Sequence, residues 1–100
     1  MAQPYTHGVW TVTPGREDEF VTAWTELAEW TCREVPGSAW VKLLRDTGAA
    51  SRFISFGPWA DTEAILAWRE LAGWEERVER IRKLVDGFEP STLELVVERE

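Results

Sequence analysis

The sequence predicts an α+β fold in which helices cover one face of an antiparallel sheet. Segments rich in Val, Thr, Ile and aromatic residues are separated by turn residues from segments in which apolar residues recur at helical spacing. Their order is strand, helix, strand, strand, helix, strand, which is typical of the ferredoxin-like βαββαβ fold. No repeat, low-complexity tract or linker interrupts the 100 residues, so we expect one domain over residues 1–100.

The first two predicted elements are a strand and a long helix. Residues 5–13 are rich in Tyr, Thr, Val and Trp and are followed by Pro14-Gly15, which predicts a strand that ends in a turn. A helix is predicted over residues 16–33, because acidic residues at its start complement the helix dipole and large apolar residues follow at helical spacing. These apolar residues are Phe20, Trp24, Leu27 and Trp30.

The middle of the chain predicts a β-hairpin. Residues 39–45 and 52–59 both have the composition of strands, and Asp46-Thr47-Gly48 between them has the residue types of a hairpin turn. We therefore expect these two strands to pair antiparallel.

The fourth region predicts a helix broken in two. Asp61 is a residue type favoured at the N-cap, and apolar residues at helical spacing follow it as far as Leu71. Gly73 is expected to interrupt or bend this helix. A third helical stretch starts at Trp74 and is expected to stop near Asp86-Gly87.

The last predicted strand, residues 92–97, suggests that both faces of the sheet are covered. Its run Leu95-Val96-Val97 breaks strict alternation, as does Leu44 in an earlier strand. Because helices cover only one face, the simplest cover for the other face is a second copy of the sheet. We therefore expect a homodimer.

Charge and composition exclude several function classes. Asp and Glu outnumber Lys and Arg by 18 to 11, which gives a net charge of −7, and no basic run interleaves with aromatic residues. No nucleic-acid partner is expected, since a nucleic-acid-binding protein must neutralise phosphates. The first residues lack the regions of a signal peptide, and no apolar run approaches the ~20 residues of a membrane span. We expect a cytoplasmic protein with no membrane partner.

The chain holds one cysteine, Cys32, and one histidine, His7. An internal disulfide is impossible, and we expect no metal site because no cluster of His and Cys ligands is available. Cys32 has no evident His partner, so a buried inert thiol is favoured over a nucleophile.

Tryptophan is the most unusual feature of the composition, with seven residues spread over all the structured regions. Core packing explains any one of them. A domain of this size encloses only a modest core, which seven indoles should overfill. Some of them are therefore expected to line a ligand pocket or a subunit interface.

Four stretches resemble the antibiotic biosynthesis monooxygenase (ABM) family, whose members share the fold of dimeric α/β barrels. They are residues 14–20 at the start of the first helix, residues 34–37 at its end, the strand 53–56 leading to Trp59, and the helix that carries Trp68. Together they span nearly the whole chain, in an order and spacing fairly specific for the superfamily.

The family includes small oxygenases that turn polycyclic phenols into quinones with neither metal nor flavin. Resemblance to them implies that Trp59 is a cavity tryptophan and that no cofactor is needed. It also places Ser55 and Ile65 where those enzymes have Asn and Tyr, so both of those polar groups are lost here.

The family also includes haem-degrading enzymes and many small proteins without an assigned reaction. Resemblance to the haem-degrading members implies that Trp68 is their helix tryptophan. It places Val78 where their haem-ligating His stands and Gly8 near their first-strand Asn. A valine cannot ligate iron, so haem degradation is a weaker hypothesis than phenol oxidation.

In the fold that this resemblance implies, the pocket lies between the sheet and its helices. Alternation along the first strand puts Gly8, Trp10 and Val12 on one face and His7, Val9 and Thr11 on the other. The candidate substrate-binding residues are Trp10, Trp24, Ser55, Trp59, Trp68 and Arg82. Core packing is the alternative role for each Trp, and Gly8 is expected to leave room for a cavity.

Two candidate residues carry ionisable groups. His7 is the candidate catalytic base, because histidine is the side chain whose ordinary pKa lies near neutrality; a structural place beside a dimer partner is the alternative. Arg82 is a candidate to hold a phenolate or carboxylate at the pocket mouth. The alternative is a solvated helix face, since Glu76 and Arg80 stand four positions apart with the acid first.

Two functions of different classes follow. The first is a cofactor-independent oxygenase of secondary metabolism that acts on an electron-rich aromatic such as a polycyclic phenol. The second is a non-catalytic aromatic-ligand-binding or cyclase-like dimer of the same fold.

Overall fold

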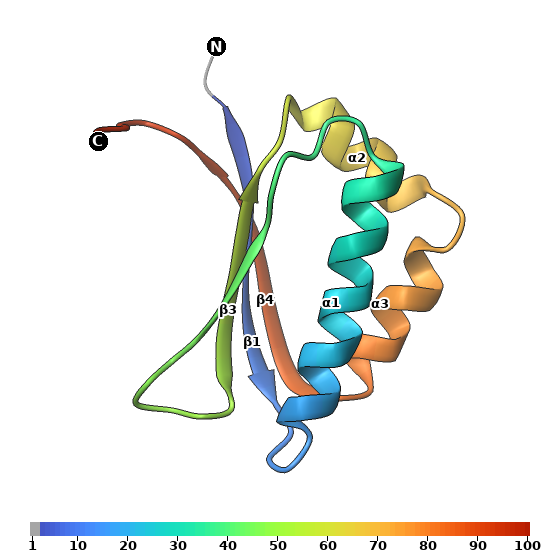
Figure 1. Cartoon of the computed structure of the whole chain (residues 1–100), viewed down its shortest axis with the longest axis vertical. Coiled ribbons are helices and arrows are strands. Elements are labelled where there is room, and N and C mark those ends of the chain that lie inside the picture. Colours follow the sequence, from blue (N-terminus) through green and yellow to red (C-terminus); the bar gives the residue numbers. More distant parts are fainter. Residues whose placement is uncertain (1–2) are drawn as a thin grey trace.

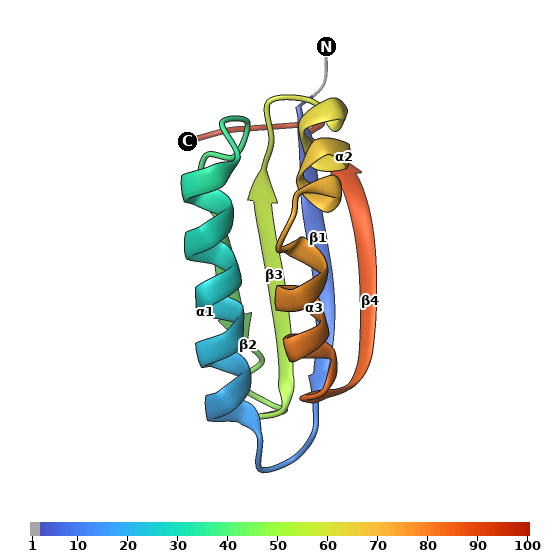
Figure 2. The same ribbon diagram turned by 90° about the vertical axis from the view of Figure 1, so that its right-hand side faces the viewer.

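A computed structural model describes residues 3–100 and shows a four-stranded antiparallel sheet with helices on one face (Figure 1). The elements are β1 (Pro4–Val12), α1 (Glu17–Glu34), β2 (Lys42–Arg45), β3 (Arg52–Pro58), α2 (Thr62–Glu70), α3 (Trp74–Arg82) and β4 (Val85–Glu94). The strand order is β2-β3-β1-β4. Seen from the helix side, α1 lies beside α2 and α3, and all three stand in front of the sheet (Figure 2). The predicted ferredoxin-like fold is confirmed.

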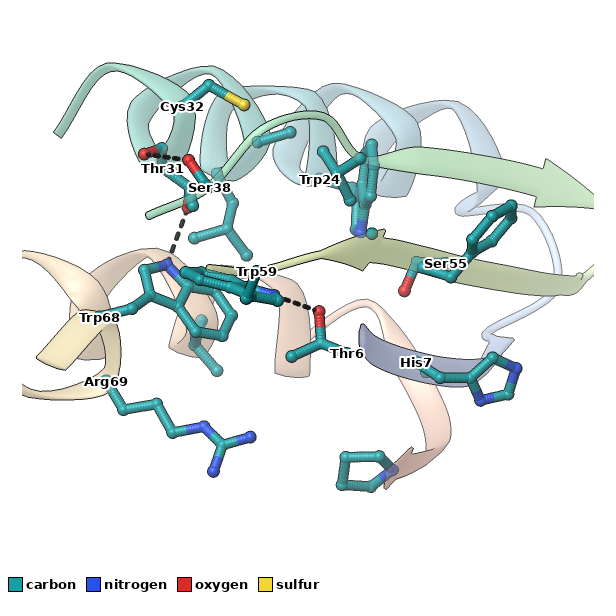
Figure 3. Close-up of a pocket in the computed structure, with 18 of the residues that line it drawn as sticks. Thr6, His7, Trp24, Thr31, Cys32, Ser38, Ser55, Trp59, Trp68 and Arg69 are labelled. Carbon is teal, nitrogen blue, oxygen red and sulfur yellow. Dashed lines mark hydrogen bonds between the residues drawn. The ribbon is translucent and has the colours of Figure 1, made fainter. Parts of the chain in front are cut away.

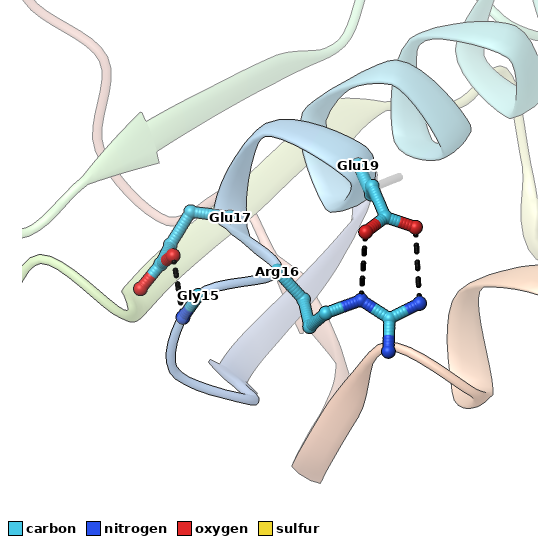
Figure 4. A network of polar contacts seen from close by, with 4 residues as sticks. All are labelled: Gly15, Arg16, Glu17 and Glu19. Atoms are coloured by element: carbon cyan, nitrogen blue, oxygen red, sulfur yellow. Dashed lines mark hydrogen bonds and ion pairs between the residues drawn. The ribbon is translucent and has the colours of Figure 1, made fainter.

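The start of α1 is held by polar contacts, as its acidic sequence predicts (Figure 4). The backbone N–H of Gly15 donates to Glu17 Oε1 at 2.9 Å, and Arg16 pairs with both carboxylate oxygens of Glu19 at 2.8 and 3.0 Å. The Ser51 hydroxyl also donates to Glu17 Oε2 at 2.6 Å. This hydrogen bond, with contributions from backbone N–H groups, lowers the pKa of Glu17.

The broken second helical region is also confirmed. Asp61 is the N-cap of α2 and accepts a hydrogen bond from the Ala64 N–H at 2.8 Å. Gly73 separates α2 from α3 with a φ of 98°, a left-handed conformation that glycine adopts without strain. The turn of the β2–β3 hairpin starts at Asp46, whose carboxylate accepts the Gly48 N–H at 2.8 Å.

Two strand predictions need correction. The strand predicted over residues 39–45 is shorter in the structure, where β2 covers only Lys42–Arg45. The last strand was predicted over residues 92–97, but β4 runs from Val85 to Glu94. Asp86-Gly87 therefore does not end α3, which stops at Arg82, and instead lies inside a strand. The β4 strand is at the sheet edge, where polar residues and Pro90 are tolerated because one side needs no hydrogen bonds, so its sequence lacks the usual strand pattern.

Between α1, α3 and the sheet, one end of the helix–sheet interface is closely packed. Val12, Phe20 and Ile81 have no exposed surface, and Phe53 lies against Phe20 with 5.0 Å between ring centroids. We call this packed cluster the closed end. Along residues 3–100, no helix has the length and apolar character needed to cross a membrane.

The opposite face of the sheet carries none of the helices formed by the described residues (Figure 1). The pairing register brings side chains of all four strands onto this face, among them Val9, Ile54, Leu44 and Leu93. Trp40 joins them through contacts with the rings of Tyr5 and Phe56. This outer face thus exposes large apolar side chains, including Leu44 at 51% and Leu93 at 46%.

Candidate functional site

A cavity of about 390 Å³ lies between the sheet and the helices, beyond the closed end and toward α2 (Figure 3). It receives side chains from α1, α2, α3 and from strands β1, β3 and β4. Its wall is mainly aromatic, with the indoles Trp10, Trp24, Trp40, Trp59, Trp68 and Trp74 and the ring of Phe88. We call this region the open end. A cavity of this size and lining is suited to an aromatic molecule.

Three indoles of the open end donate their N–H groups to hydroxyl groups of the wall. Trp10 donates to Ser55 Oγ at 2.9 Å, Trp59 to Thr6 Oγ1 at 2.9 Å, and Trp68 to Thr31 Oγ1 at 2.8 Å. Figure 3 shows the last two pairs on either side of the Trp59 ring. Each pair joins residues far apart in the chain, so it fixes the indole ring relative to another element.

These pairs leave the hydroxyl hydrogens available. Within residues 3–100, no protein acceptor is found for the O–H of Thr6, Thr31 or Ser55. Because the oxygen of each already accepts from an indole, its remaining hydrogen can donate to a ligand oxygen. The polar side of this wall therefore favours ligands with acceptor oxygens.

Trp74 differs from these three indoles. Its ring lies edge-on to Trp68 with centroids 5.9 Å apart, and its buried Nε1 has no hydrogen-bond partner in the described part of the chain. An unpaired buried donor is costly, and it stands out in a structure where most such groups are paired.

Gly8 and Phe88 shape the inner end of the cavity. A Cβ at Gly8 would lie 2.7 Å from Cε1 of Phe88 and 3.1 Å from Ser55 Oγ. Phe88 stacks on Trp10 with centroids 3.8 Å apart. The Phe88 ring therefore fills the space beside Gly8. By stacking on Trp10, it keeps the indole in place for its hydrogen bond to Ser55.

The predicted site residues all border this cavity, but the ring of His7 faces differently from the rest. Trp10, Trp24, Ser55, Trp59, Trp68, Arg82 and His7 are all lining residues. Alternation along β1 puts the His7 side chain on the face opposite Gly8 and Trp10, where its Nδ1 lies 3.3 Å from Ser91 Oγ.

Two arginines lie at the cavity wall. Arg82, predicted from sequence, is 3.2 Å from both Glu75 and Glu79, so two carboxylates already hold its guanidinium. Arg69 at the end of α2 was not predicted, because sequence alone does not show that it turns toward the cavity. The alternative role, a solvated helix face with ion pairs, fits Arg82, whose partners lie in its own helix. The expected pair of Glu76 with Arg80 is not formed, because Arg80 pairs with Glu26 of α1.

The structure also decides two smaller points. Cys32 borders the cavity and is exposed, whereas its neighbour Thr31 is buried and accepts from Trp68, so the expectation of a buried thiol was wrong. Val78 lines the cavity as well, and its side chain offers no ligand to a haem iron. Among residues 3–100, no three His, Cys, Asp or Glu side chains are grouped as metal ligands would be.

Comparison with known proteins gives a clear family match. The model of the family described as antibiotic biosynthesis monooxygenase matches residues 5–80. A comparison with curated proteins gave no significant match.

Solved structures share the fold at low sequence identity. SnoaB, a cofactor-independent oxygenase from Streptomyces nogalater, superposes with a TM-score of 0.86 at 20% identity, covering 100% of this chain and 96% of its own. A protein from Caulobacter crescentus CB15 that carries the same family description gives 0.87 at 15% identity, with coverages of 96% and 92%. A Pseudomonas aeruginosa protein gives 0.82 at 14% identity, with 97% of both chains covered. At these identities the likeness shows the fold.

Proposed function

The chain belongs to the antibiotic biosynthesis monooxygenase family, and we propose that it is a cofactor-independent oxygenase of secondary metabolism that oxidises a polycyclic phenol. Family membership supports a monooxygenase-type function. The observation that carries the finer proposal is the open end, a cavity of about 390 Å³ walled by indoles whose hydroxyl partners have free O–H groups.

The proposed reaction uses these features in sequence. The indoles stack on the ring system and exclude water from it, and a wall hydroxyl such as that of Ser55 donates to the substrate oxygen. That hydrogen bond stabilises the anion formed when the substrate loses a proton. The anion then reduces O₂: one oxygen atom enters the ring as the new quinone carbonyl, and the other leaves as water.

His7 is the proposed base for the proton transfer. It borders the cavity from the opposite face of β1, with Nδ1 3.3 Å from Ser91 Oγ, so the proton reaches its ring through a bridging water. The replacement of His7 by Gln is expected to lower the rate, with ligand affinity unchanged. An unaltered rate would assign the proton to another group.

The direct test is turnover of anthrone in air with purified protein, without added metal or flavin. We expect anthraquinone to form faster than in the protein-free control, with one O₂ consumed per quinone. The Ser55→Ala variant should be slower because it loses the donor to the substrate oxygen. No acceleration over a broad panel of phenols would refute the oxygenase proposal.

The second candidate, a non-catalytic aromatic-binding or cyclase-like protein, is favoured by one specific observation. Ile65, at the position where the oxygenases have Tyr, is buried against Val35 and Trp59 and brings no polar group to the cavity. A non-catalytic protein of this kind binds phenols without O₂ uptake. Oxygen-electrode and binding measurements on one sample therefore separate the two candidate functions.

We also propose that two copies pair through the outer faces of their sheets. Support comes from the exposed apolar side chains there, since an uncovered sheet surface of this kind promotes aggregation. Light scattering should give twice the chain mass at neutral pH. A monodisperse monomer at micromolar concentration would contradict this pairing.

A further inference from the structure

Arg69 is a cation at the cavity wall for which residues 3–100 provide no ion-pair partner. It stands in the last turn of α2, directly after Trp68, and is exposed. Figure 3 shows its side chain extended past the Trp68 ring, with the guanidinium away from the helix that carries it. Within residues 3–100 it forms no ion pair, hydrogen bond or stacking contact with an aromatic ring.

Most other arginines of the chain are engaged. Five are ion-paired, namely Arg16, Arg33, Arg52, Arg80 and Arg82. Two lie over aromatic rings, namely Arg45 over Phe53 and Arg77 over Trp30. With 18 acidic residues against 11 basic ones, partners are abundant, so an unpaired arginine at the cavity is unusual for this chain.

The chemistry of Arg69 differs from that of the hydroxyl donors deeper in the cavity. A guanidinium is permanently charged and binds a carboxylate through two parallel hydrogen bonds. The hydroxyl of Ser55, at the inner end beside Gly8 and Phe88, is a neutral donor suited to a phenol or carbonyl oxygen. The cavity thus offers a neutral donor at the inner end and a cation at the wall formed by α2.

We infer that the ligand of this cavity is an aromatic carboxylate whose carboxylate group is bound by Arg69. This inference rests on the proposed function for the aromatic cavity and names the substrate class that it selects. Arg69 is then a specificity-determining residue, and the ligand carries its phenol or carbonyl oxygen on the ring system away from the carboxylate.

Two probes of nearly equal size test the inference, 6-hydroxy-2-naphthoate and its neutral amide 6-hydroxy-2-naphthamide. Calorimetric titration at neutral pH and low salt should show tighter binding of the naphthoate. The Arg69→Gln variant should lose about fivefold in affinity for the naphthoate and almost none for the amide, as expected for a partly exposed charge pair. Arg69→Lys should restore part of the preference, and added salt should reduce it.

Arg80→Gln is the matched control, because Arg80 is another exposed arginine that pairs with Glu26 and does not line the cavity. It should leave both affinities unchanged. Equal binding of the two probes, or a preference that survives Arg69→Gln, would overturn the role of Arg69 while leaving the aromatic cavity intact. Failure of both probes to bind would refute the aromatic cavity itself, and the inference with it.

Discussion

The two ends of the helix–sheet interface are built from different residues. At the closed end, Val12, Phe20 and Ile81 are fully buried between α1, α3 and the sheet. At the open end, Trp24, Trp68 and Trp74 are only partly buried and surround a cavity of about 390 Å³. The same layers, helices over a sheet, are thus packed at one end and hollow at the other.

The difference shows how a small chain combines stability with a binding site. Branched aliphatic side chains and Phe rings fill space efficiently and need no polar partner. Indoles are rigid and carry one N–H, so each can be fixed by a single hydroxyl, as Trp68 is by Thr31. Rings fixed in this way do not collapse into the space beside them, and the cavity remains open.

The largest expected effect is at the closed end. Phe20→Ala removes a fully buried ring that lies against Trp10 and Phe53. We expect the free energy of unfolding to fall by ~3–5 kcal/mol, as for other buried aromatic residues replaced by Ala. Chemical denaturation followed by circular dichroism measures it. A loss below about 1 kcal/mol would mean that this end is not closely packed.

At the open end, Trp68→Ala should affect binding more than stability. The ring is partly buried and contacts Trp59 and Trp74, so its loss should cost about 1–3 kcal/mol of stability but weaken aromatic binding about tenfold. Trp59→Ala should be the less stable of the two variants, because Trp59 is only 5% exposed. Denaturation and ligand titration on both variants check this order. A folded Trp68→Ala protein with unchanged affinity would remove that residue from the site.

The smallest effect lies outside both ends, at the start of α1. The hydrogen bond from Ser51 lowers the pKa of Glu17, so the folded state binds this proton less well than the unfolded state. The resulting stabilisation is present above the ordinary pKa of Glu and is lost as pH falls through the lowered value. In Ser51→Ala, an NMR pH titration should find the pKa of Glu17 closer to its ordinary value. An unchanged pKa would assign the shift to the backbone donors.

The sequence predicts the fold well because local signals agree with one another. Acidic residues in the first turn of α1, the N-cap Asp61 and the break at Gly73 all mark real boundaries. The exception is β4, whose edge position allows Gly87 and Pro90 where an interior strand would not.

The site is less predictable because it depends on which partners meet across the fold. The tryptophans and Ser55 were selected from composition and family resemblance, and the structure brings them around one cavity. Their hydroxyl partners Thr6 and Thr31 lie in other elements and carry no local sequence signal. Arg82 pairs with Glu75 and Glu79 of its own helix, whereas Arg69 forms no ion pair among residues 3–100, and the sequence alone does not show that Arg69 borders the cavity.

The most direct test of the open end uses the indole N–H signals of the protein in an NMR titration with 2-naphthol. Six tryptophans border the cavity, namely Trp10, Trp24, Trp40, Trp59, Trp68 and Trp74, whereas Trp30 packs under Arg77 away from it and serves as an internal reference. We predict saturable shifts for the lining indoles, with the signal of Trp30 nearly unchanged. Absence of saturable shifts, or shifts as large for Trp30 as for the lining indoles, would contradict an aromatic-binding cavity at this end of the molecule.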